Sequence, residues 1–207
     1  DTHYAYAAAA LDAGLDVVCD KPVSETHAQA LDLLARTQAR QRIFAIAHAY
    51  SAYPMIRHAR QMVRDGAIGA VRLVQVEYIQ SGLATRLEDG PLNNRLRWVL
   101  DPARSGQALV MSAIGCHAQH LACFVAGLPV TRVAADVGAL LPGRKVVDHV
   151  SALLEFGGGA RGTFTVTQAA AALSVEHRSL GPTQLRSVAG PIDLFVIELT
   201  EPSDPAW

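Results

Sequence analysis

The sequence predicts an α/β protein that opens with a parallel sheet. Residues 4–13 are rich in alanine, which is typical of a helix. Residues 16–20 and 41–47 are short apolar runs, which are typical of buried strands. A second helix is expected between them over residues 25–39, with Ser24 as its N-cap. Helices and strands that alternate with short connections form a parallel sheet, and strands that are apolar throughout indicate helices on both faces.

The pattern changes after these two strands. Residues 54–65 have the apolar spacing of an amphipathic helix, and residues 71–80 alternate as a half-buried strand does. Residues 81–106 are polar, so we expect a loop there, and loops of that length are uncommon unless they are functional. A helix over 110–126 follows; beyond Gly181 the pattern weakens, and the tail SDPAW has no element signal. Three more strands, the last two joined by a glycine hairpin, are expected at 130–139, 147–156 and 160–169.

The composition excludes several classes of protein. Half of the 207 residues are hydrophobic and 18% are charged, so the chain is not disordered and can bury a sizeable core. The formal net charge of −1 leaves no basic excess for a phosphate backbone, so nucleic acid is not an expected partner. No apolar run approaches the ~20 residues of a membrane span, so we expect no membrane association. Three cysteines without a CxxC spacing favour reduced thiols in a cytoplasmic protein.

Two segments carry a resemblance to a known family. Residues 3–22 read HYAYAAAALDAGLDVVCDKP, and residues 98–127 read WVLDPARSGQALVMSAIGCHAQHLACFVAG. In that order and at that distance they resemble the Gfo/Idh/MocA oxidoreductases, the family of glucose–fructose oxidoreductase and inositol dehydrogenase. The resemblance extends over about residues 2–180. Shorter pieces agree with it: AHAYSAYP at 47–54, RDGAIGAVRLV at 64–74 and FGGGARGTFTVTQ at 156–168.

The resemblance implies a fold of two domains. Residues 1–50 would be the α/β remnant of a Rossmann NAD(P)-binding domain. Residues 51–207 would form an α+β domain with a large, mostly antiparallel open sheet that binds substrate and forms homo-oligomers. The family's G-x-G-x-x-G element and the residue that selects NAD or NADP are expected upstream of Asp1, in a part of roughly 70 residues. We therefore expect this truncated chain to bind NAD or NADP weakly or not at all.

A literal G-x-G-x-x-G does occur, at residues 157–162. The dinucleotide fingerprint needs a helix after its glycines, so that the pyrophosphate meets the helix N-terminus. Here the segment GTFTVTQ follows, and its alternation is that of a strand. We therefore expect a hairpin turn at this place and no phosphate site.

Lys21 is the sharpest candidate for chemistry. It follows a buried strand and precedes Pro22, which places it at the carboxyl edge of a parallel sheet, where open α/β folds bind ligands. Its ammonium group can donate a hydrogen bond to a substrate hydroxyl or carbonyl, and it can share in proton transfer if burial lowers its pKa. His48 and Tyr50 follow the next strand and reach the same edge.

The resemblance assigns roles to further residues. Lys21 and His117 would be catalytic. The residues expected near the cofactor are Asp20, Lys21, Pro22, His48 and Trp98. The residues expected near the substrate are Tyr50, His117, His120 and Gln168. A neutral imidazole with a pKa near 6.5 suits the role of base or proton relay that the family gives to its histidine.

Two positions depart from the family pattern. The family has D-x-G-x-H at the start of this helix, and here Gly115 and His117 match while Ala113 replaces the carboxylate. Val99 stands after Trp98, where arginine is common in the family. Both replacements favour an alternative function, that of a non-catalytic sheet module for association or ligand binding.

A metal site is a further alternative. His117 and His120 share one face of a helix, and His149 or Asp148 could complete a ligand set. Two histidines at this spacing are more typical of a shared polar face, so we expect no metal. The sequence therefore predicts an NAD(P)-dependent oxidoreductase that acts on a sugar, a polyol or a related hydroxy compound, and it leaves the substrate open.

Overall fold

A computed structural model describes residues 2–106, 108–170, 175–184 and 191–199 of the chain. They fall into two units, one ending at Ala170 and one beginning after it. In the second unit, β7 (Val175–Gln184) and β8 (Pro191–Leu199) form an antiparallel pair. Beyond Gly181, where the sequence pattern weakens, the chain completes β7 and forms β8. The sequence PIDLFVIEL of β8 contains β-branched and aromatic residues, which favour a strand.

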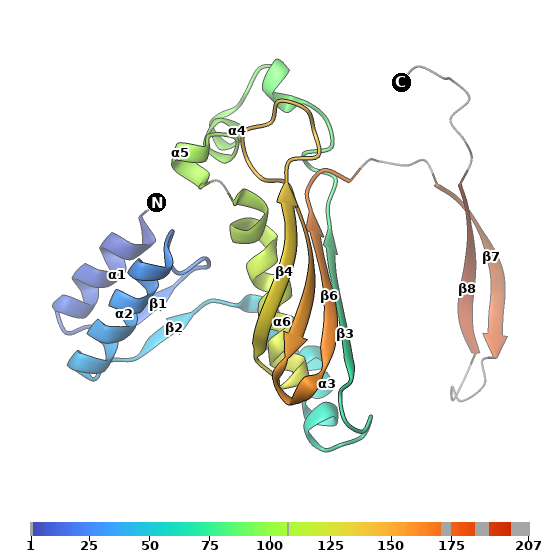
Figure 1. Cartoon of the computed structure of the whole chain (residues 1–207), viewed down its shortest axis with the longest axis horizontal. Coiled ribbons are helices and arrows are strands. Elements are labelled where there is room, and N and C mark those ends of the chain that lie inside the picture. The colour runs from blue at the N-terminus through green and yellow to red at the C-terminus, as the bar shows by residue number, and fades with distance from the viewer. Residues whose placement is uncertain (1, 107, 171–174, 185–190, 200–207) are drawn as a thin grey trace. The chain divides into compact units, whose positions relative to one another are not determined.

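The first unit begins with the expected parallel pair. The elements are α1 (His3–Asp12), β1 (Val17–Cys19), α2 (His27–Arg40) and β2 (Phe44–Ile46). The two strands run parallel, and both helices pack on one face of them (Figure 1). The buried side chains of this small core include Leu11, Leu33 and Cys19.

The other face of this strand pair is not covered, which corrects the expectation of helices on both faces. Val18 is 80% exposed and Ile43 is 69% exposed. Both α1 and α2 pack with the strands in one apolar cluster, on the same side of the sheet. Among the described residues, no helix covers the other side. Continuous apolarity in a strand therefore did not indicate burial on both faces here.

The start of α2 corrects a second expectation. Thr26, not Ser24, is the N-cap: its side chain accepts a hydrogen bond from the backbone N–H of Gln29, whose side chain accepts one from the N–H of Thr26. This reciprocal pair is a capping box. The hydroxyl of Ser24 instead donates to the carbonyl of Thr26.

A four-stranded sheet dominates the rest of the first unit. It contains β3 (Leu73–Ile79), β4 (Val130–Gly138), β5 (His149–Phe156) and β6 (Arg161–Thr167), in the order β3-β6-β5-β4. The pairs β4–β5 and β5–β6 are antiparallel, and β3 joins β6 in parallel. The expected open, mostly antiparallel sheet is confirmed. The glycine run forms η4 (Gly157–Gly159), the turn between β5 and β6, as expected.

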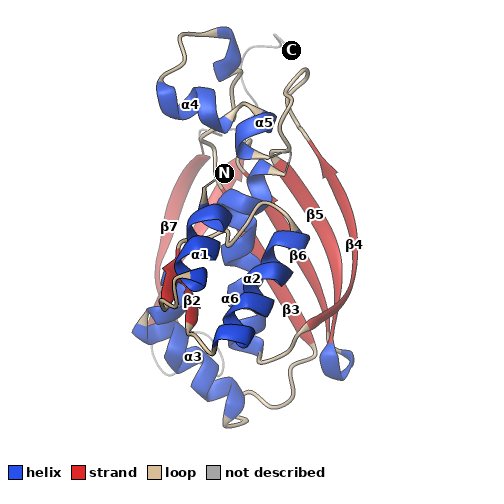
Figure 2. Ribbon diagram, turned by 90° about the vertical axis from the view of Figure 1, so that its left-hand side faces the viewer, coloured by secondary structure: helices blue, strands red, loops and turns tan. Residues whose placement is uncertain are grey.

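Helices cover one face of this sheet. A π-helical turn η3 (Met111–Gly115) leads into α6 (Cys116–Ala126), and α3 (Pro54–Arg64) packs beside α6 (Figure 2). Ile114 and Ala118 meet inward-facing strand residues in a buried cluster that includes Val150, Phe164 and Val166. In the part of the chain that the structure describes, no helix is long and apolar enough to cross a membrane.

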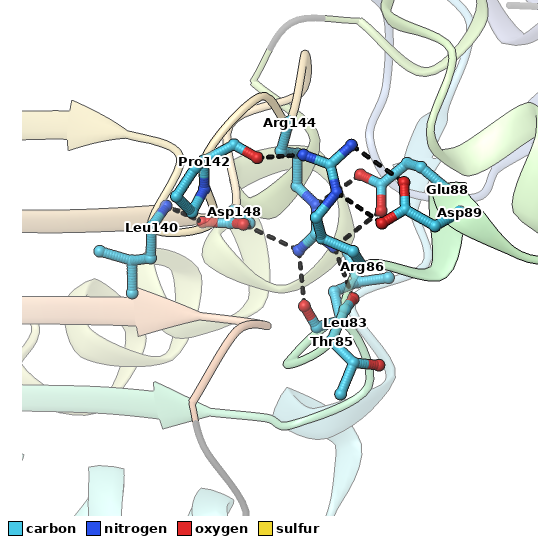
Figure 3. A network of polar contacts seen from close by, with 9 residues as sticks. All are labelled: Leu83, Thr85, Arg86, Glu88, Asp89, Leu140, Pro142, Arg144 and Asp148. Atoms are coloured by element: carbon cyan, nitrogen blue, oxygen red, sulfur yellow. Dashed lines mark hydrogen bonds and ion pairs between the residues drawn. The ribbon is translucent and has the colours of Figure 1, made fainter. Parts of the chain in front are cut away.

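The segment 81–106 is folded, not a simple loop. It contains η2 (Leu87–Asp89), α4 (Asn94–Val99) and α5 (Pro102–Ser105). The segment is tied down by Arg144, whose side chain is 1% exposed. Arg144 forms ion pairs with Glu88 and Asp148 and donates to the backbone carbonyls of Leu83 and Thr85 (Figure 3). Sequence periodicity missed α4 and α5 because they are only six and four residues long; the local signals were the N-caps Asn93 and Asp101, whose side chains accept backbone N–H groups of these helices.

Candidate functional site

Lys21 lies where it was expected, at the carboxyl end of β1, in a cis Lys21–Pro22 peptide. Its Nζ donates to the carbonyl oxygen of Ala113 at 2.7 Å and lies 3.4 Å from that of Ser112. Two of the three donors of the ammonium group are therefore directed at the π-helical turn before α6. The third remains available to a ligand.

Three histidines gather beside this lysine, and we call His48, His117 and His120 the histidine group. His48 follows β2, and the other two lie on α6. The rings of His48 and His120 stack, with centroids 3.9 Å apart and planes within 6° of each other. The His117 ring stands edge-on to His48 at 6.2 Å. The end of β2 and the beginning of α6 therefore meet through aromatic rings.

The environment keeps these rings neutral near pH 7. Burial is the main cause that lowers the pKa of each member of the group below its ordinary value of 6.5. The charge of Lys21 lowers the pKa of His48 and His117 further, and the charge of Arg60 does so for His120. A neutral imidazole can accept a proton, so His117 is in the state that a general base requires.

A chain of polar side chains extends from His117 across the sheet. The ring of Tyr50, in η1 (Ala49–Ala52), lies 4.6 Å from that of His117. Its hydroxyl forms a hydrogen bond of 3.0 Å with that of Tyr78. This hydrogen bond, together with burial, raises the pKa of Tyr78. The amide of Gln168 donates to the side-chain oxygen of Gln80 at 3.3 Å. Gln168 thus lies at the end of β6, beside the end of β3, as its position in the sequence indicated.

Tyr78 and Gln80 were missed by the sequence analysis. Both follow the alternation of β3, on the face of Val74 and Val76 that packs against the core. That period of two, together with the position at the end of the strand, is the signal that could have identified them. What the sequence did not give is that β3 lies parallel to β6, which brings Gln80 next to Gln168.

Asp20 and Trp98, both expected near the cofactor, lie in different parts of the first unit. Asp20 adjoins Lys21, and its carboxylate accepts the backbone N–H of Lys21 at 2.8 Å. Trp98 lies on α4, in the lobe whose apolar residues pack around Leu83, Leu109 and Val146. Within the described residues, no hydrogen bond or ring contact joins Trp98 to the histidine group. Val99 belongs to the same apolar cluster, so its side chain serves packing.

The residues considered as further metal ligands lie away from the histidine group. Asp148 is fully buried in its ion pair with Arg144 and also accepts the N–H of Leu140. His149 is on the sheet face opposite α6, where its ring contacts the hydroxyl of Ser151. Among the described residues, no set of three or more His, Cys, Asp or Glu side chains is arranged to hold a metal ion.

Comparison with known proteins adds the family. Residues 56–179 match the family model described as the GFO/IDH/MocA C-terminal domain. Residues 1–48 match the family model described as an oxidoreductase family with an NAD-binding Rossmann fold. The chain belongs to the Gfo/Idh/MocA family. The resemblance stated from the sequence is therefore confirmed.

Similar proteins in this family are longer than the chain, which matches less than half of each. An uncharacterized oxidoreductase of Bacillus subtilis is 26% identical over 179 residues, which is 86% of this chain and 45% of that protein. An inositol dehydrogenase homolog of Azotobacter vinelandii, solved as a complex with NAD+, is 28% identical with a TM-score of 0.76. That match covers 83% of this chain and 44% of the homolog. The Gfo/Idh/MocA chain described here thus spans about half the length of these relatives.

Proposed function

We propose that the protein containing this chain is an NAD- or NADP-dependent dehydrogenase of a hydroxy compound such as a sugar or polyol. The observation that carries the proposal is the approach of the Lys21 ammonium group and the His117 ring, a hydrogen-bond donor and a neutral base from distant parts of the sequence. The same homolog from Azotobacter vinelandii has also been solved with NADH and myo-inositol, and a levoglucosan dehydrogenase of Pseudarthrobacter phenanthrenivorans is 24% identical over 187 residues. Both support a substrate with hydroxyl groups.

The residues present fit one end of a dinucleotide. Asp20, Lys21 and Pro22 lie at the carboxyl end of a parallel strand, the place where such folds bind the cofactor. The glycine run 157–162 does not form a phosphate-binding loop before a helix, because it forms the hairpin turn between β5 and β6. Its last glycine, Gly162, allows close strand packing: a Cβ there would lie 2.5 Å from the carbonyl oxygen of Val74. We therefore propose that the described residues hold the nicotinamide end and that this chain alone binds the cofactor weakly.

In the proposed mechanism, the free N–H donor of Lys21 polarises the hydroxyl that is oxidised. His117 takes the hydroxyl proton, because burial and the charge of Lys21 lower the pKa of its ring and so favour the neutral form that can accept a proton. The bound cofactor supplies the hydride acceptor. Tyr50 packs against the His117 ring and limits its rotation.

The test begins with the intact mass of the natural polypeptide that contains these residues, followed by its purification. Reduction of NAD and of NADP is then followed by absorbance with a panel of polyols and sugars. Lys21→Ala and His117→Ala are each expected to lower kcat by about 10²–10⁴-fold, the usual effect of losing a positioned acid or base. Lys145→Ala, which removes an exposed lysine, is the matched control and should leave kcat unchanged. Turnover that survives Lys21→Ala would refute the proposal.

The alternative, a non-catalytic sheet module, is favoured by one observation. At Ala113 the backbone carbonyl, not a side-chain carboxylate, holds Lys21. The same experiment decides between the two: absence of turnover with every substrate and both cofactors, in a protein that is folded and oligomeric, would establish the module instead.

We also propose that the uncovered face of the four-stranded sheet associates with a second copy. Cross-strand pairing places Arg132, Glu155 and Arg161 in one row on this face, joined by ion pairs. The acidic Asp136 and Glu77 lie in a second row on the same face, four residues further along the strands. A twofold axis would set the basic end of one copy against the acidic end of the other, a complementary arrangement.

Light scattering of the purified chain tests this association. A mass of two chains or a multiple of that is expected, and Leu153→Asp is expected to give single chains. Leu153 is 67% exposed between the two rows, so the substitution adds charge to the contact without disturbing the core. Leu140→Asp, at an exposed leucine in the loop after β4, is the control. A chain that is monomeric before substitution would exclude the contact.

A further inference from the structure

The charges around the histidine group are unbalanced. Lys21 acts on two of the three rings and Arg60 on the third. Among the described residues, Asp20 is the single carboxylate whose charge acts on the group, and it acts on His117 alone. Its oxygen is already engaged by the backbone N–H of Lys21. Two other titratable neighbours favour their neutral forms: a hydrogen bond with Tyr50 and burial raise the pKa of Tyr78, and burial raises the pKa of the Cys116 thiol.

The hydrogen-bonding capacity of the site is also unmet. Lys21 is held by two neutral carbonyl oxygens and, within the described residues, forms no ion pair with a carboxylate. His48 Nδ1, His117 Nδ1 and His120 Nε2 are buried without a hydrogen-bond partner. Buried polar atoms of this kind are usually satisfied, so they indicate a missing water or ligand.

The position that could balance the lysine carries no charge. Ala113 lies in η3, and its carbonyl oxygen is 2.7 Å from Lys21 Nζ. The Ala113 side chain is partly buried against two apolar clusters, so residue 113 offers the ammonium group a neutral carbonyl and no charge. Alanine leaves one positive charge for an incoming group to pair with.

We propose that the site of this chain takes a polyhydroxy carboxylate, in which the reacting carbinol lies beside a carboxylate group, in preference to a neutral polyol. The inference deepens the proposed function, on which it rests, by naming the substrate class. The substrate carboxylate lies beside the Lys21 charge and accepts hydrogen bonds from the N–H groups of His48 and His120, while the free N–H of Lys21 and the His117 ring remain on the reacting carbinol.

Binding of such an anion is coupled to proton uptake. A carboxylate next to His48 and His120 favours the protonated form of these two rings and so raises their pKa toward neutral pH, while His117 stays neutral as the proposed proton transfer requires. Proton uptake on binding makes the affinity rise as the pH falls from 8 to 6. A neutral polyol has no charge that would raise the pKa of the rings, so its affinity should not rise as the pH falls.

Calorimetric titration of the 207-residue chain distinguishes the two ligand classes. D-gluconate and D-glucitol share one carbon chain and differ in a carboxylate against a hydroxymethyl group. Gluconate is expected to bind at least about tenfold more tightly at pH 7, as a charge-assisted contact would provide. Repeating the titration in two buffers of different ionisation enthalpy should reveal net proton uptake for gluconate. Equal affinities, tighter binding of glucitol, or no binding of either ligand would overturn the inference.

Three variants sharpen the test. Ala113→Asp is expected to weaken gluconate binding by about tenfold or more and to abolish proton uptake, because the added carboxylate takes the place of the ligand's. Ala113→Asn has nearly the same shape without the charge, so it controls for packing and should keep the preference for gluconate. Lys145→Gln changes the net charge at an exposed lysine and should change nothing. If Asp and Asn have the same effect, the charge argument is wrong.

These outcomes are separable from those of the proposed function. A protein that oxidises neutral polyols and binds glucitol as tightly as gluconate overturns the substrate class and leaves the dehydrogenase intact. A protein that binds gluconate with proton uptake and shows no turnover overturns the dehydrogenase and leaves the binding preference intact.

Discussion

Arg144 and Asp148 form a fully buried ion pair, with Nη1 and Oδ2 2.9 Å apart and side chains 1% and 0% exposed. Arg144 is also paired with Glu88 and holds two carbonyls of the segment 81–106. One side chain therefore connects the loop after β4, the start of β5 and the lobe that contains α4 and α5.

Replacement of Arg144 should unfold this lobe or the whole first unit. Arg144→Ala leaves Asp148 charged and buried without its ion-pair partner, which is expected to lower the free energy of unfolding by about 3–5 kcal/mol. Arg132→Ala removes the arginine of an exposed pair with Glu155 and should cost about 0–1 kcal/mol. Urea denaturation of both variants measures the difference. Equal losses would contradict the assigned role of Arg144.

Gly162 permits the close approach of β6 to β3. A Cβ at this residue would lie 2.5 Å from the carbonyl oxygen of Val74 and 2.9 Å from the ring of Phe156. Because backbone cannot give way cheaply, Gly162→Ala is expected to lower the free energy of unfolding by about 1–3 kcal/mol. Gly138→Ala, also in a strand, meets nothing within 4 Å and should be close to neutral. Thermal unfolding of the pair checks the contrast.

The capping box at α2 predicts which of two hydroxyl groups, Thr26 or Ser24, contributes to the free energy of unfolding. Thr26→Ala removes the oxygen that accepts the N–H of Gln29 and should cost about 1 kcal/mol. Ser24→Ala removes one exposed hydrogen bond to a carbonyl that remains accessible to water, so a loss within about 0.5 kcal/mol is expected. A larger loss at Ser24 than at Thr26 in urea denaturation would restore the cap that the sequence first indicated.

The histidine group makes stability depend on pH. The pKa of each ring is lowered in the folded chain, so the unfolded chain binds protons more readily as the pH falls through 6.5. The stabilisation is complete above that pH and is lost as the pH falls toward the lowered folded values, so the free energy of unfolding should be smaller at pH 5.5 than at pH 7.5.

Variants assign that dependence to particular rings. His48→Gln combined with His120→Gln is expected to reduce the pH dependence of the free energy of unfolding, measured by urea denaturation at both pH values. His58→Gln, at an exposed histidine on α3, is the matched control and should leave the dependence as it is. A double variant with an unchanged dependence would show that other groups carry it.

Local patterns were sufficient for most of the architecture. The period of two in residues 147–156 and 160–169, with glycines between them, predicted the β5–β6 hairpin, because alternation and turn chemistry act between neighbours in the chain. The same reasoning failed where distant groups decide. The path of residues 83–88 is held by contacts with Arg144, and the burial of Val18 depends on whether a second layer covers its face.

The candidate site was predicted in part. Lys21, His48 and Tyr50 were placed at one sheet edge because the carboxyl ends of parallel strands share an edge. Tyr78 and Gln80 entered the site only when the structure set β3 parallel to β6, a pairing between segments almost ninety residues apart.

By itself the sequence determined the family, the succession of a short parallel layer and an open sheet, and the identity of Lys21 and His117 as the groups to test. These follow from residue types and short-range periodicity, which the chain carries wherever it folds. The tertiary structure decided that Lys21 is held by the carbonyl of Ala113, that His48 stacks on His120, and that the rings are neutral. Those properties depend on distance, burial and neighbouring charge, and these are fixed only when segments remote in the sequence pack together.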